Sequence, residues 1–269
     1  NTLPYTTLFR SGITGGEVDM TLFAPPGLYQ RAKTAIESGF MSAEGLAQIQ
    51  PRDQDVHSWQ YRNLHVLPEG AGAALCFALD SKGQLVESDA LAGRVLILDF
   101  GAYTLDAIIM NNGSITPADL ETASLEKAGV HEHILKPLVS QLKKQGGDFS
   151  RVTRELIDQV IRRGLATGDY TLTIGASSID IEKPLGKLAT RYADMIQNKV
   201  IDDAFDGLKG IKAALLIGGG SVLVEDHLRD TYTSKIMNPA DYEDTKDIHP
   251  VDMNVAGGLR YTLYKAQGC

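Results

Sequence analysis

The sequence predicts an α/β fold, in which strands and helices alternate along the chain and pack in layers. Two observations concern strands: residues 95–98 and 213–217 are fully apolar runs of strand length, and each leads into a glycine-containing turn. The third concerns helices, because residues 130–144 carry apolar side chains at the spacing of one helix face. The chain has 269 residues, 43% of them hydrophobic, which is enough for one large domain or two ordinary ones.

The remaining elements follow from the same periodicities and from turn residues. The predicted strands are 17–23, 64–67, 95–98, 105–110, 170–174, 179–181 and 213–217. The predicted helices are 28–38, 71–79, 130–144, 151–163, 185–205, 221–230 and 251–265. Among single residues, we expect Pro137 to bend its helix, Gly164 to end the helix 151–163, and Ser221 to be an N-cap. Asn112-Gly113 indicates a hairpin turn.

Charge and composition exclude several classes of function. Aspartate and glutamate exceed lysine and arginine by eight, which argues against broad electrostatic binding to DNA or to anionic lipid. Cys76 and Cys269 are the two cysteines, which is neither a disulfide framework nor a zinc pattern. The longest apolar runs are far shorter than the roughly 20 residues that span a bilayer. We therefore expect a soluble, cytoplasmic protein.

The strongest chemical signal is the segment 98–106, Leu-Asp-Phe-Gly-Ala-Tyr-Thr-Leu-Asp. Asp99 ends an apolar strand, where a carboxylate needs a cation or hydrogen bonds to compensate it. A magnesium ion held through water suits it, because this ion keeps most of its hydration and is usually shared with phosphate. Gly101 lets a phosphate approach the backbone amides of the turn, and Thr104 adds a hydroxyl. An ordinary β-hairpin with a polar turn has the same pattern.

A second signal is Gly218-Gly219-Gly220, between an apolar strand and a helix. Glycines permit flat, close contact with a ligand, and a helix N-terminus favours a negative group, so a nucleotide fits there. A tight strand-to-helix connection explains the glycines equally well. Glu225, in the first helical turn, complements the helix dipole in either case.

Other polar residues carry weaker signals. Glu69 follows a strand end, where a carboxylate can orient or deprotonate a water that attacks phosphorus. His131 and His133 point in different directions on a helix, so we expect packing or solvated roles rather than metal binding. Trp59 is likewise expected to be a packing residue. Lys143-Lys144 and Arg162-Arg163 are expected to be solvated helix ends.

The order of these segments resembles the actin, sugar kinase and DnaK-type chaperone superfamily, and within it ParM and its StbA relatives. Residues 16–31 look like that family's strand and Pro-containing loop after its SGLP element, and residues 66–71 look like its VMPES segment. Residues 96–110 are similar to its second phosphate hairpin, 215–225 to its adenosine motif, and 252–259 to its last connecting helix. The resemblance implies an actin-like ATPase, or ribonuclease H-like, two-domain fold.

The resemblance also implies roles for single residues, with ATP, or GTP, and Mg as cofactors. Asp99 would hold the magnesium-bound water, and Glu69 would act on the attacking water. Gly101 and Thr104, with Ala102 and Tyr103 between them, would bind the β- and γ-phosphates. Gly218, Gly219, Gly220 and Glu225 would lie on the adenosine side. Ala102 and Tyr103 depart from the family, which usually has a second glycine followed by threonine.

The start of the chain also departs from the family, whose members begin with a hairpin bearing an Asp-x-Gly phosphate loop. No such hairpin precedes Gly12, and residues 4–11 resemble the translation of a sequencing-adapter oligonucleotide. We therefore expect an incomplete first domain and impaired ATP hydrolysis in this chain. The expected parts are a non-native or disordered tail at 1–11, the remainder of domain I at 12–92 plus 255–269, and domain II at 93–254.

The function implied is that of a filament-forming ATPase that segregates plasmid DNA. Its implied partners are copies of itself and a DNA-bound adaptor protein, without direct nucleic acid binding and without a membrane. Two alternatives share the fold: a non-polymerising scaffold of the PilM or FtsA type, and a small-molecule kinase. The departures at Ala102 and Tyr103 keep the scaffold open, whereas a kinase usually needs added segments for its substrate pocket.

Overall fold

The computed structural model describes residues 15–41, 46–49, 56–116, 120 and 124–268, so the tail expected at residues 1–11 lies outside the described residues. The chain forms two compact units. Unit 1 takes in the described residues of 1–91, 116–122 and 239–269, and unit 2 those of 92–115 and 123–238. Strands and helices alternate in both, so the predicted α/β class is confirmed. None of the described helices is both long enough and apolar enough to cross a membrane.

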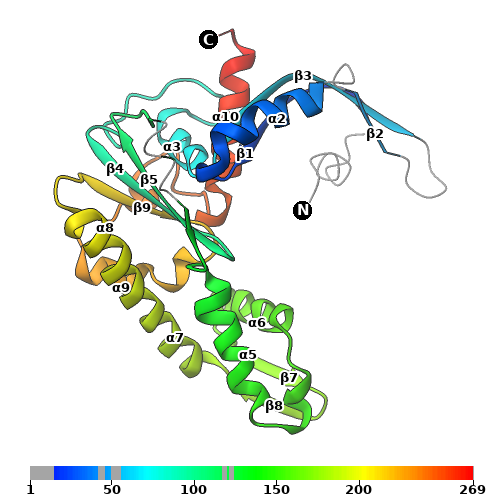
Figure 1. Ribbon diagram of the computed structural model, residues 1–269, viewed down its shortest axis with the longest axis vertical. Helices are drawn as coiled ribbons and strands as arrows, with labels where there is room; N and C mark the ends of the chain where they lie inside the picture. The colour runs from blue at the N-terminus through cyan, green and yellow to red at the C-terminus, as the bar shows by residue number, and fades with distance from the viewer. Residues whose placement is uncertain (1–14, 42–45, 50–55, 117–119, 121–123, 269) are drawn as a thin grey trace. The chain divides into compact units, whose positions relative to one another are not determined.

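Unit 1 is built on a three-stranded sheet in the order β1-β3-β2, with β1 and β3 parallel and β2 antiparallel to β3 (Figure 1). Its elements are β1 (Gly15–Ala24), η1 (Pro26–Leu28), α2 (Tyr29–Met41), β2 (Leu46–Ile49), β3 (His57–Pro68), α3 (Ala71–Ala78), η7 (Pro239–Asp241), η8 (Pro250–Asp252) and α10 (Met253–Ala266). Trp59 on β3 is fully buried, which confirms its packing role.

Helices α3 and α10 touch through glycine. A Cβ atom added to Gly257 of α10 would lie 1.7 Å from the carbonyl oxygen of Gly72 in α3, so only glycine allows this approach. Asn254 Oδ1 accepts hydrogen bonds from the backbone N–H of Gly70 (3.0 Å) and of Ala73 (3.3 Å) at the start of α3. The backbone N–H groups in the first turn of a helix have no acceptor within the helix. Asn254 Oδ1 of α10 supplies one, so it caps the N-terminus of α3.

Residues 239–254 pack with unit 1, although their sequence position led us to expect them in domain II. Two contacts account for this. Arg260 of α10 is buried and donates to the carbonyl oxygens of Cys76 (2.8 Å), Leu79 (2.6 Å) and Asp244 (2.6 Å). The rings of Phe77 and Tyr242 meet edge to face, with centroids 5.1 Å apart.

Unit 2 contains a four-stranded sheet in the order β6-β5-β4-β9, in which β4 is antiparallel to β5 and parallel to β9. The strands are β4 (Arg94–Phe100), β5 (Thr104–Asn111), β6 (Ser124–Glu126) and β9 (Ala213–Ile217). The central strands β4 and β9 are buried along almost the whole of their apolar runs. At Asn112-Gly113 both residues have positive φ, 47° and 74°, which confirms the predicted hairpin turn.

Unit 2 also contains helices and a second, two-stranded sheet. The helices are η2 (His131–Leu135), α5 (Lys136–Lys143), η3 (Gly147–Arg151), α6 (Arg154–Thr167), α7 (Glu182–Met195), η4 (Ile196–Asp202), α8 (Asp203–Phe205), η5 (Asp206–Leu208), η6 (Ser221–Leu223) and α9 (Glu225–Thr231). The small sheet pairs β7 (Thr171–Ile174) with β8 (Ser177–Asp180), and β7 lies beside α6 (Figure 1). A π turn, η2, directly precedes Pro137, where we expect the helix to bend.

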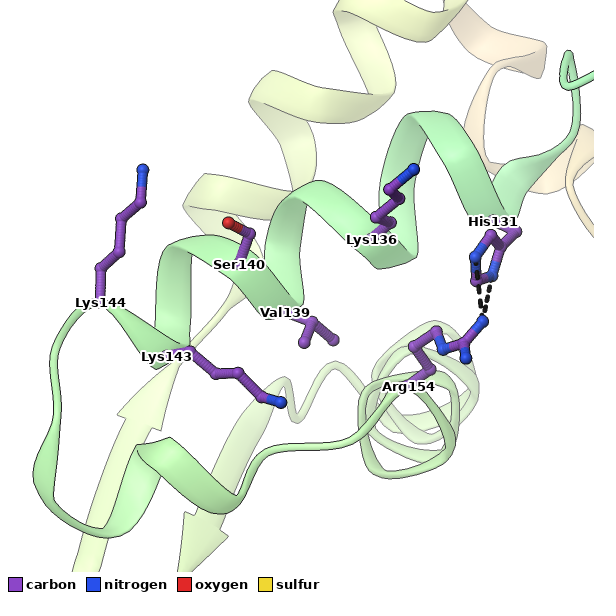
Figure 2. Close-up of a pocket in the computed structure, with 7 residues that line it drawn as sticks. All are labelled: His131, Lys136, Val139, Ser140, Lys143, Lys144 and Arg154. Carbon is purple, nitrogen blue, oxygen red and sulfur yellow. Dashed lines mark hydrogen bonds between the residues drawn. The ribbon is translucent and has the colours of Figure 1, made fainter.

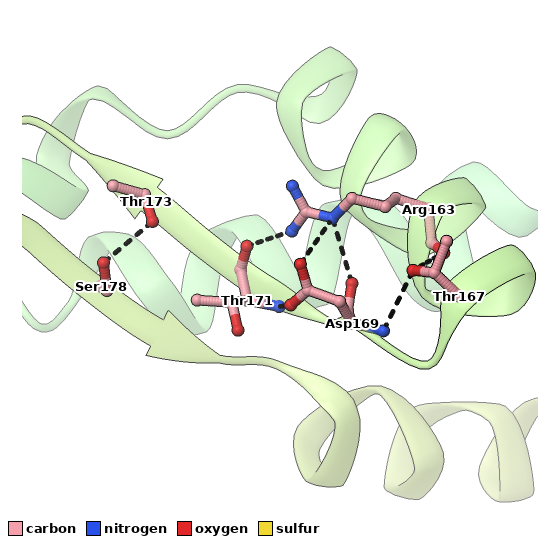
Figure 3. A network of polar contacts seen from close by, with 6 residues as sticks. All are labelled: Arg163, Thr167, Asp169, Thr171, Thr173 and Ser178. Carbon is pink, nitrogen blue, oxygen red and sulfur yellow. Dashed lines mark hydrogen bonds and ion pairs between the residues drawn. The ribbon is translucent and has the colours of Figure 1, made fainter.

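Helix α6 does not end at Gly164, so that prediction is wrong. The helix continues to Thr167 and ends at Gly168, whose φ of 76° is the left-handed C-terminal conformation. A Cβ at Gly164 would lie 2.2 Å from the Tyr170 ring, so this glycine permits close packing instead. Figure 3 shows the connection that follows, where Arg163 donates to the carbonyl oxygens of Asp169 (3.1 Å) and Thr171. Arg163 therefore holds this connection and is not a freely solvated helix end.

Ser221 is not an N-cap. Its hydroxyl donates to the carbonyl oxygen of Gly218 (2.8 Å), and its backbone N–H donates to the same oxygen (3.2 Å). The chain first forms the short 3-10 turn η6, and α9 begins only at Glu225. The serine thus stabilises the glycine turn after β9 rather than the helix that follows.

Candidate functional site

The turn between β4 and β5 is fixed from one side by the segment 129–131. Its three successive carbonyl oxygens each accept a hydrogen bond from that segment: Gly101 from Val130 N–H (3.1 Å), Ala102 from His131 N–H (2.7 Å) and Tyr103 from Gly129 N–H (3.2 Å). In a trans peptide the C=O and the next N–H point in opposite directions. The N–H groups of Ala102 and Tyr103 therefore point away from the segment 129–131.

Ala102 and Tyr103 are both exposed, and the Tyr103 side chain lies 64% open to solvent. Successive backbone N–H groups directed to one accessible side form a concavity that binds anions. The phosphate grip at this turn stays a prediction. Backbone amides would supply its donors, so the side chains of Ala102 and Tyr103 do not remove them.

Gly129 belongs to this site but carries no sequence signal of its own. A Cβ there would lie 2.5 Å from the carbonyl carbon of Tyr103 and 2.6 Å from the carbonyl oxygen of Ala102. Because only glycine allows the two backbones to approach this closely, Gly129 makes the three hydrogen bonds possible. A small residue just before the helix at 130 is the only hint that the sequence offers.

Asp99 lies at the end of β4, directly opposite Asp106 on β5 and Ile217 on β9. Its side chain is half-buried, whereas Asp106 is 3% exposed. The Thr104 hydroxyl donates to Asp106 Oδ2 over 3.5 Å, at the outer limit of a hydrogen bond. The Thr104 hydroxyl is thus directed to Asp106 in this structure, and its predicted contact with phosphate stays a prediction.

The glycines after β9 meet this turn. Gly220 N–H donates to the carbonyl oxygen of Phe100 (3.2 Å). Gly218 has a φ of 83°, and a Cβ there would lie 2.5 Å from Asp99 Oδ1. Gly219, between them, is exposed. The two strongest sequence signals, 118 residues apart at Gly101 and Gly219, therefore lie at one place in unit 2.

Two other predicted site residues have structural contacts of their own. Glu225 forms an ion pair with Arg229 (2.7 Å), and Arg229 also donates to the carbonyl oxygens of Ile236 (3.3 Å) and Met237 (3.0 Å). This clamp joins α9 to the segment after it. Glu69 belongs to unit 1, between β3 and α3, where its backbone N–H donates to the Ala24 carbonyl (2.9 Å) and its side chain is half-buried.

The two histidines pack, as expected. His133 stacks on the buried Tyr192 ring, with centroids 5.0 Å apart, and His131 lies against the Tyr103 ring at the same distance. Burial raises the pKa of Tyr192, whose hydroxyl donates to the Ala128 carbonyl (2.8 Å). Among the described residues, no group of three or more His, Cys, Asp or Glu side chains converges as a metal site.

Comparison with known proteins finds similarities of sequence and of fold. Residues 97–230 match a family described as archaeal actin homologue MreB-like, C-terminal. No curated protein sequence matches the chain significantly. The structure is similar to that of Ta0583, an archaeal actin homolog, in complex with ADP, with a TM-score of 0.70 and 16% identity over 98% of this chain and 76% of that one.

Two solved ParM structures are also similar to this chain. Bacillus thuringiensis ParM with ATP has a TM-score of 0.68 and 13% identity, over 98% of this chain and 71% of that one. A ParM from a 15-stranded filament of Clostridium botulinum has a TM-score of 0.64 and 17% identity, over 90% and 65%. The chain therefore has the actin-like two-domain α/β fold.

Proposed function

We propose that this chain is ParM-like. It carries the ATP- and magnesium-binding site of an ATPase whose nucleotide-dependent filaments segregate plasmid DNA in the cytoplasm, and its own ATP hydrolysis is impaired. The observation that carries the proposal is the meeting of two segments. Ala102 and Tyr103 are exposed, with backbone amides directed away from the segment 129–131, and Gly218–Gly220 lie against the same turn. Solved structures with this fold include one with ADP, one with ATP and one filament.

The roles we propose follow the donor chemistry. Gly101 and Thr104, with the amides of Ala102 and Tyr103 between them, bind the β- and γ-phosphates, and Gly218–Gly220, with Glu225, lie on the adenosine side. Asp99 offers a carboxylate at a strand end, which fits Mg held through water; the bound ion would neutralise phosphate charge. Glu69 orients the attacking water. Domain I, to which Glu69 belongs, is proposed to include residues 239–254 together with the C-terminal helix, because they pack in the same unit, and domain II to end at residue 238.

Binding and hydrolysis are tested first, with the full chain. We expect a fluorescent ATP analogue to bind in the presence of Mg and to be displaced by ATP. Asp99→Asn should weaken Mg-dependent binding at least tenfold, because it removes the charge that holds the hydrated ion. Asp158→Asn, which changes an exposed carboxylate on α6, is the matched control. Equal affinity of Asp99→Asn and the control would remove Asp99 from the site.

Assembly is tested by sedimentation and light scattering with ATP, GTP, ADP and no nucleotide. Reversible pelleting with the triphosphate, and loss of the pellet after hydrolysis, supports the filament. Nucleotide binding without pelleting in any state supports a non-polymerising scaffold instead. Phosphate transfer only in the presence of a sugar or acid acceptor supports a kinase. Bare plasmid DNA should not co-sediment, because the proposed DNA contact runs through an adaptor protein.

A further inference from the structure

A basic groove lies in unit 2 between α5 and the N-terminal end of α6, with a volume of about 610 Å³ (Figure 2). Its lining is His131, Lys136, Val139, Ser140, Lys143, Lys144 and Arg154. No carboxylate lines it, although the chain as a whole has a net charge of −8. This concentration of positive charge on an acidic protein needs an explanation.

The cations of the groove are only partly neutralised by the protein. Lys136 forms an ion pair with Glu132 (2.7 Å). Within the described part of the chain, Lys143 and Lys144 are exposed and have no carboxylate partner within 4.0 Å. Arg154 contacts the His131 ring, with Nη1 3.0 Å from Nε2, and this contact leaves the rest of its guanidinium for another ligand. The groove therefore offers at least two lysines and part of an arginine to an anion.

The groove is also joined to the turn at 101–104. His131 lines the groove with its ring, donates its backbone N–H to the Ala102 carbonyl (2.7 Å) and packs on the Tyr103 ring. Arg154 contacts the His131 ring, and His131 in turn contacts the turn at 101–104. A change in the turn on phosphate binding would therefore move one wall of the groove.

An acidic surface of suitable chemistry exists on the same chain, in unit 1. Residues 241–247 read Asp-Tyr-Glu-Asp-Thr-Lys-Asp, and Asp241, Glu243 and Asp247 are exposed. Lys246 is the one cation there and pairs with Glu243 (2.7 Å). The pKa of Tyr242 is raised by burial and then by the carboxylates of Asp89 and Asp241, which shows that negative charge gathers at this surface.

We propose that the basic groove at α5 and α6 docks the acidic segment 241–247 of a second copy of this chain. The proposal rests on the filament function proposed above and names its contact. Opposite charges on two different surfaces make a head-to-tail contact, which repeats into an open chain rather than closing as a symmetric dimer. Because exposed charges carry the contact, it weakens as salt rises, and His131 makes it sensitive to the occupancy of the turn.

The test is a charge swap in trans. Groove variant Lys143→Glu/Lys144→Glu and segment variant Glu243→Lys/Asp247→Lys should each raise the critical concentration for ATP-dependent pelleting about tenfold or more, since like charges then face each other. An equimolar mixture should restore pelleting, because each variant then meets an opposite charge. Lys183→Glu/Lys187→Glu, on the exposed face of α7, is the control and should pellet like wild type. Circular dichroism checks that all variants fold.

Failure of this inference and failure of the proposed function are distinguishable. If the wild-type protein does not pellet with any nucleotide, the proposed filament function is refuted. The docking is then tested separately, by measuring with sedimentation velocity at low salt whether the same charge-swap variants form oligomers. If wild type assembles but the groove variant assembles equally well, or the mixture does not recover, the docking is refuted while the filament stands. Retardation of duplex DNA by wild type but not by the groove variant, without recovery of assembly in the mixture, would assign the groove to nucleic acid and also refute the docking.

Discussion

Gly129→Ala tests whether the segment 129–131 holds the candidate phosphate turn. The new Cβ would lie 2.5 Å from the Tyr103 carbonyl carbon, whereas ordinary van der Waals contact begins at 3.4 Å. The two backbones must therefore separate by about 0.9 Å, since 3.4 minus 2.5 is 0.9. The three hydrogen bonds measure 2.7, 3.1 and 3.2 Å, so a separation of this size breaks or weakens all of them.

The expected cost follows from those three bonds. At roughly 0.5–1.5 kcal/mol each, their loss amounts to about 2–4 kcal/mol of local stability. Hydrogen exchange of the amides at 129–131, which are the donors, should accelerate roughly 30- to 1000-fold, because 1.4 kcal/mol corresponds to tenfold. Affinity for ATP should fall in parallel, since the amides of Ala102 and Tyr103 lose their fixed direction.

A matched control separates the contact from a general effect of alanine. Gly186 lies in α7, and a Cβ there would meet nothing within 4 Å, so Gly186→Ala should stabilise the helix by about 0.5–1 kcal/mol. It should leave the exchange of residues 129–131 and ATP binding unchanged. If Gly129→Ala keeps wild-type exchange at these amides, the backbone contact does not hold the turn and the proposed mechanism loses its support.

Three further outcomes are expected from contacts elsewhere. Tyr192→Phe should lower thermal stability by about 1–2 kcal/mol, because the buried Ala128 carbonyl loses its donor, whereas Tyr170→Phe should change little. Arg260→Met should destabilise unit 1 by about 3 kcal/mol or more in urea unfolding, since three carbonyls lose a charged donor; a cost below about 1 kcal/mol would show that water replaces it. Burial raises the pKa of the Cys76 thiol to about 11. The folded protein then keeps a proton on Cys76 that the unfolded chain loses near pH 8.5. The free energy of unfolding should therefore fall as the pH rises from about 9 to 11. Measured over the same pH range, Cys76→Ala should lack this fall.

The parts of the fold that the sequence predicts are those set by local pattern. The apolar runs at 95–98 and 213–217 became β4 and β9, and Asn112-Gly113 became a hairpin turn, because periodicity and positive φ are properties of a few neighbouring residues. The two halves of the candidate site, at Asp99 and at Gly218–Gly220, were identifiable for the same reason. That they meet depends on the register of β4 with β9, which no local pattern encodes.

The failures have a common physical cause. Gly164 and Gly129 are needed for close contact with distant residues, Tyr170 in one case and the turn at 101–104 in the other. A glycine that ends a helix and a glycine that admits a neighbour look the same in sequence. Ser221 failed similarly, because the carbonyl of Gly218 accepts its hydroxyl before the helix begins. In each case the role of the residue depends on a contact that forms only in the folded chain.

The contact between α3 and α10 constrains the order in which the chain can fold during synthesis. Unit 2 is complete once residue 238 has been made, so its sheet and helices can form while the ribosome is still working. Helix α3 must wait, because the acceptor that caps it, Asn254, and the arginine that binds its last carbonyls, Arg260, are translated about 180 residues later. Until then the strands of unit 1 remain without the helix that packs on them.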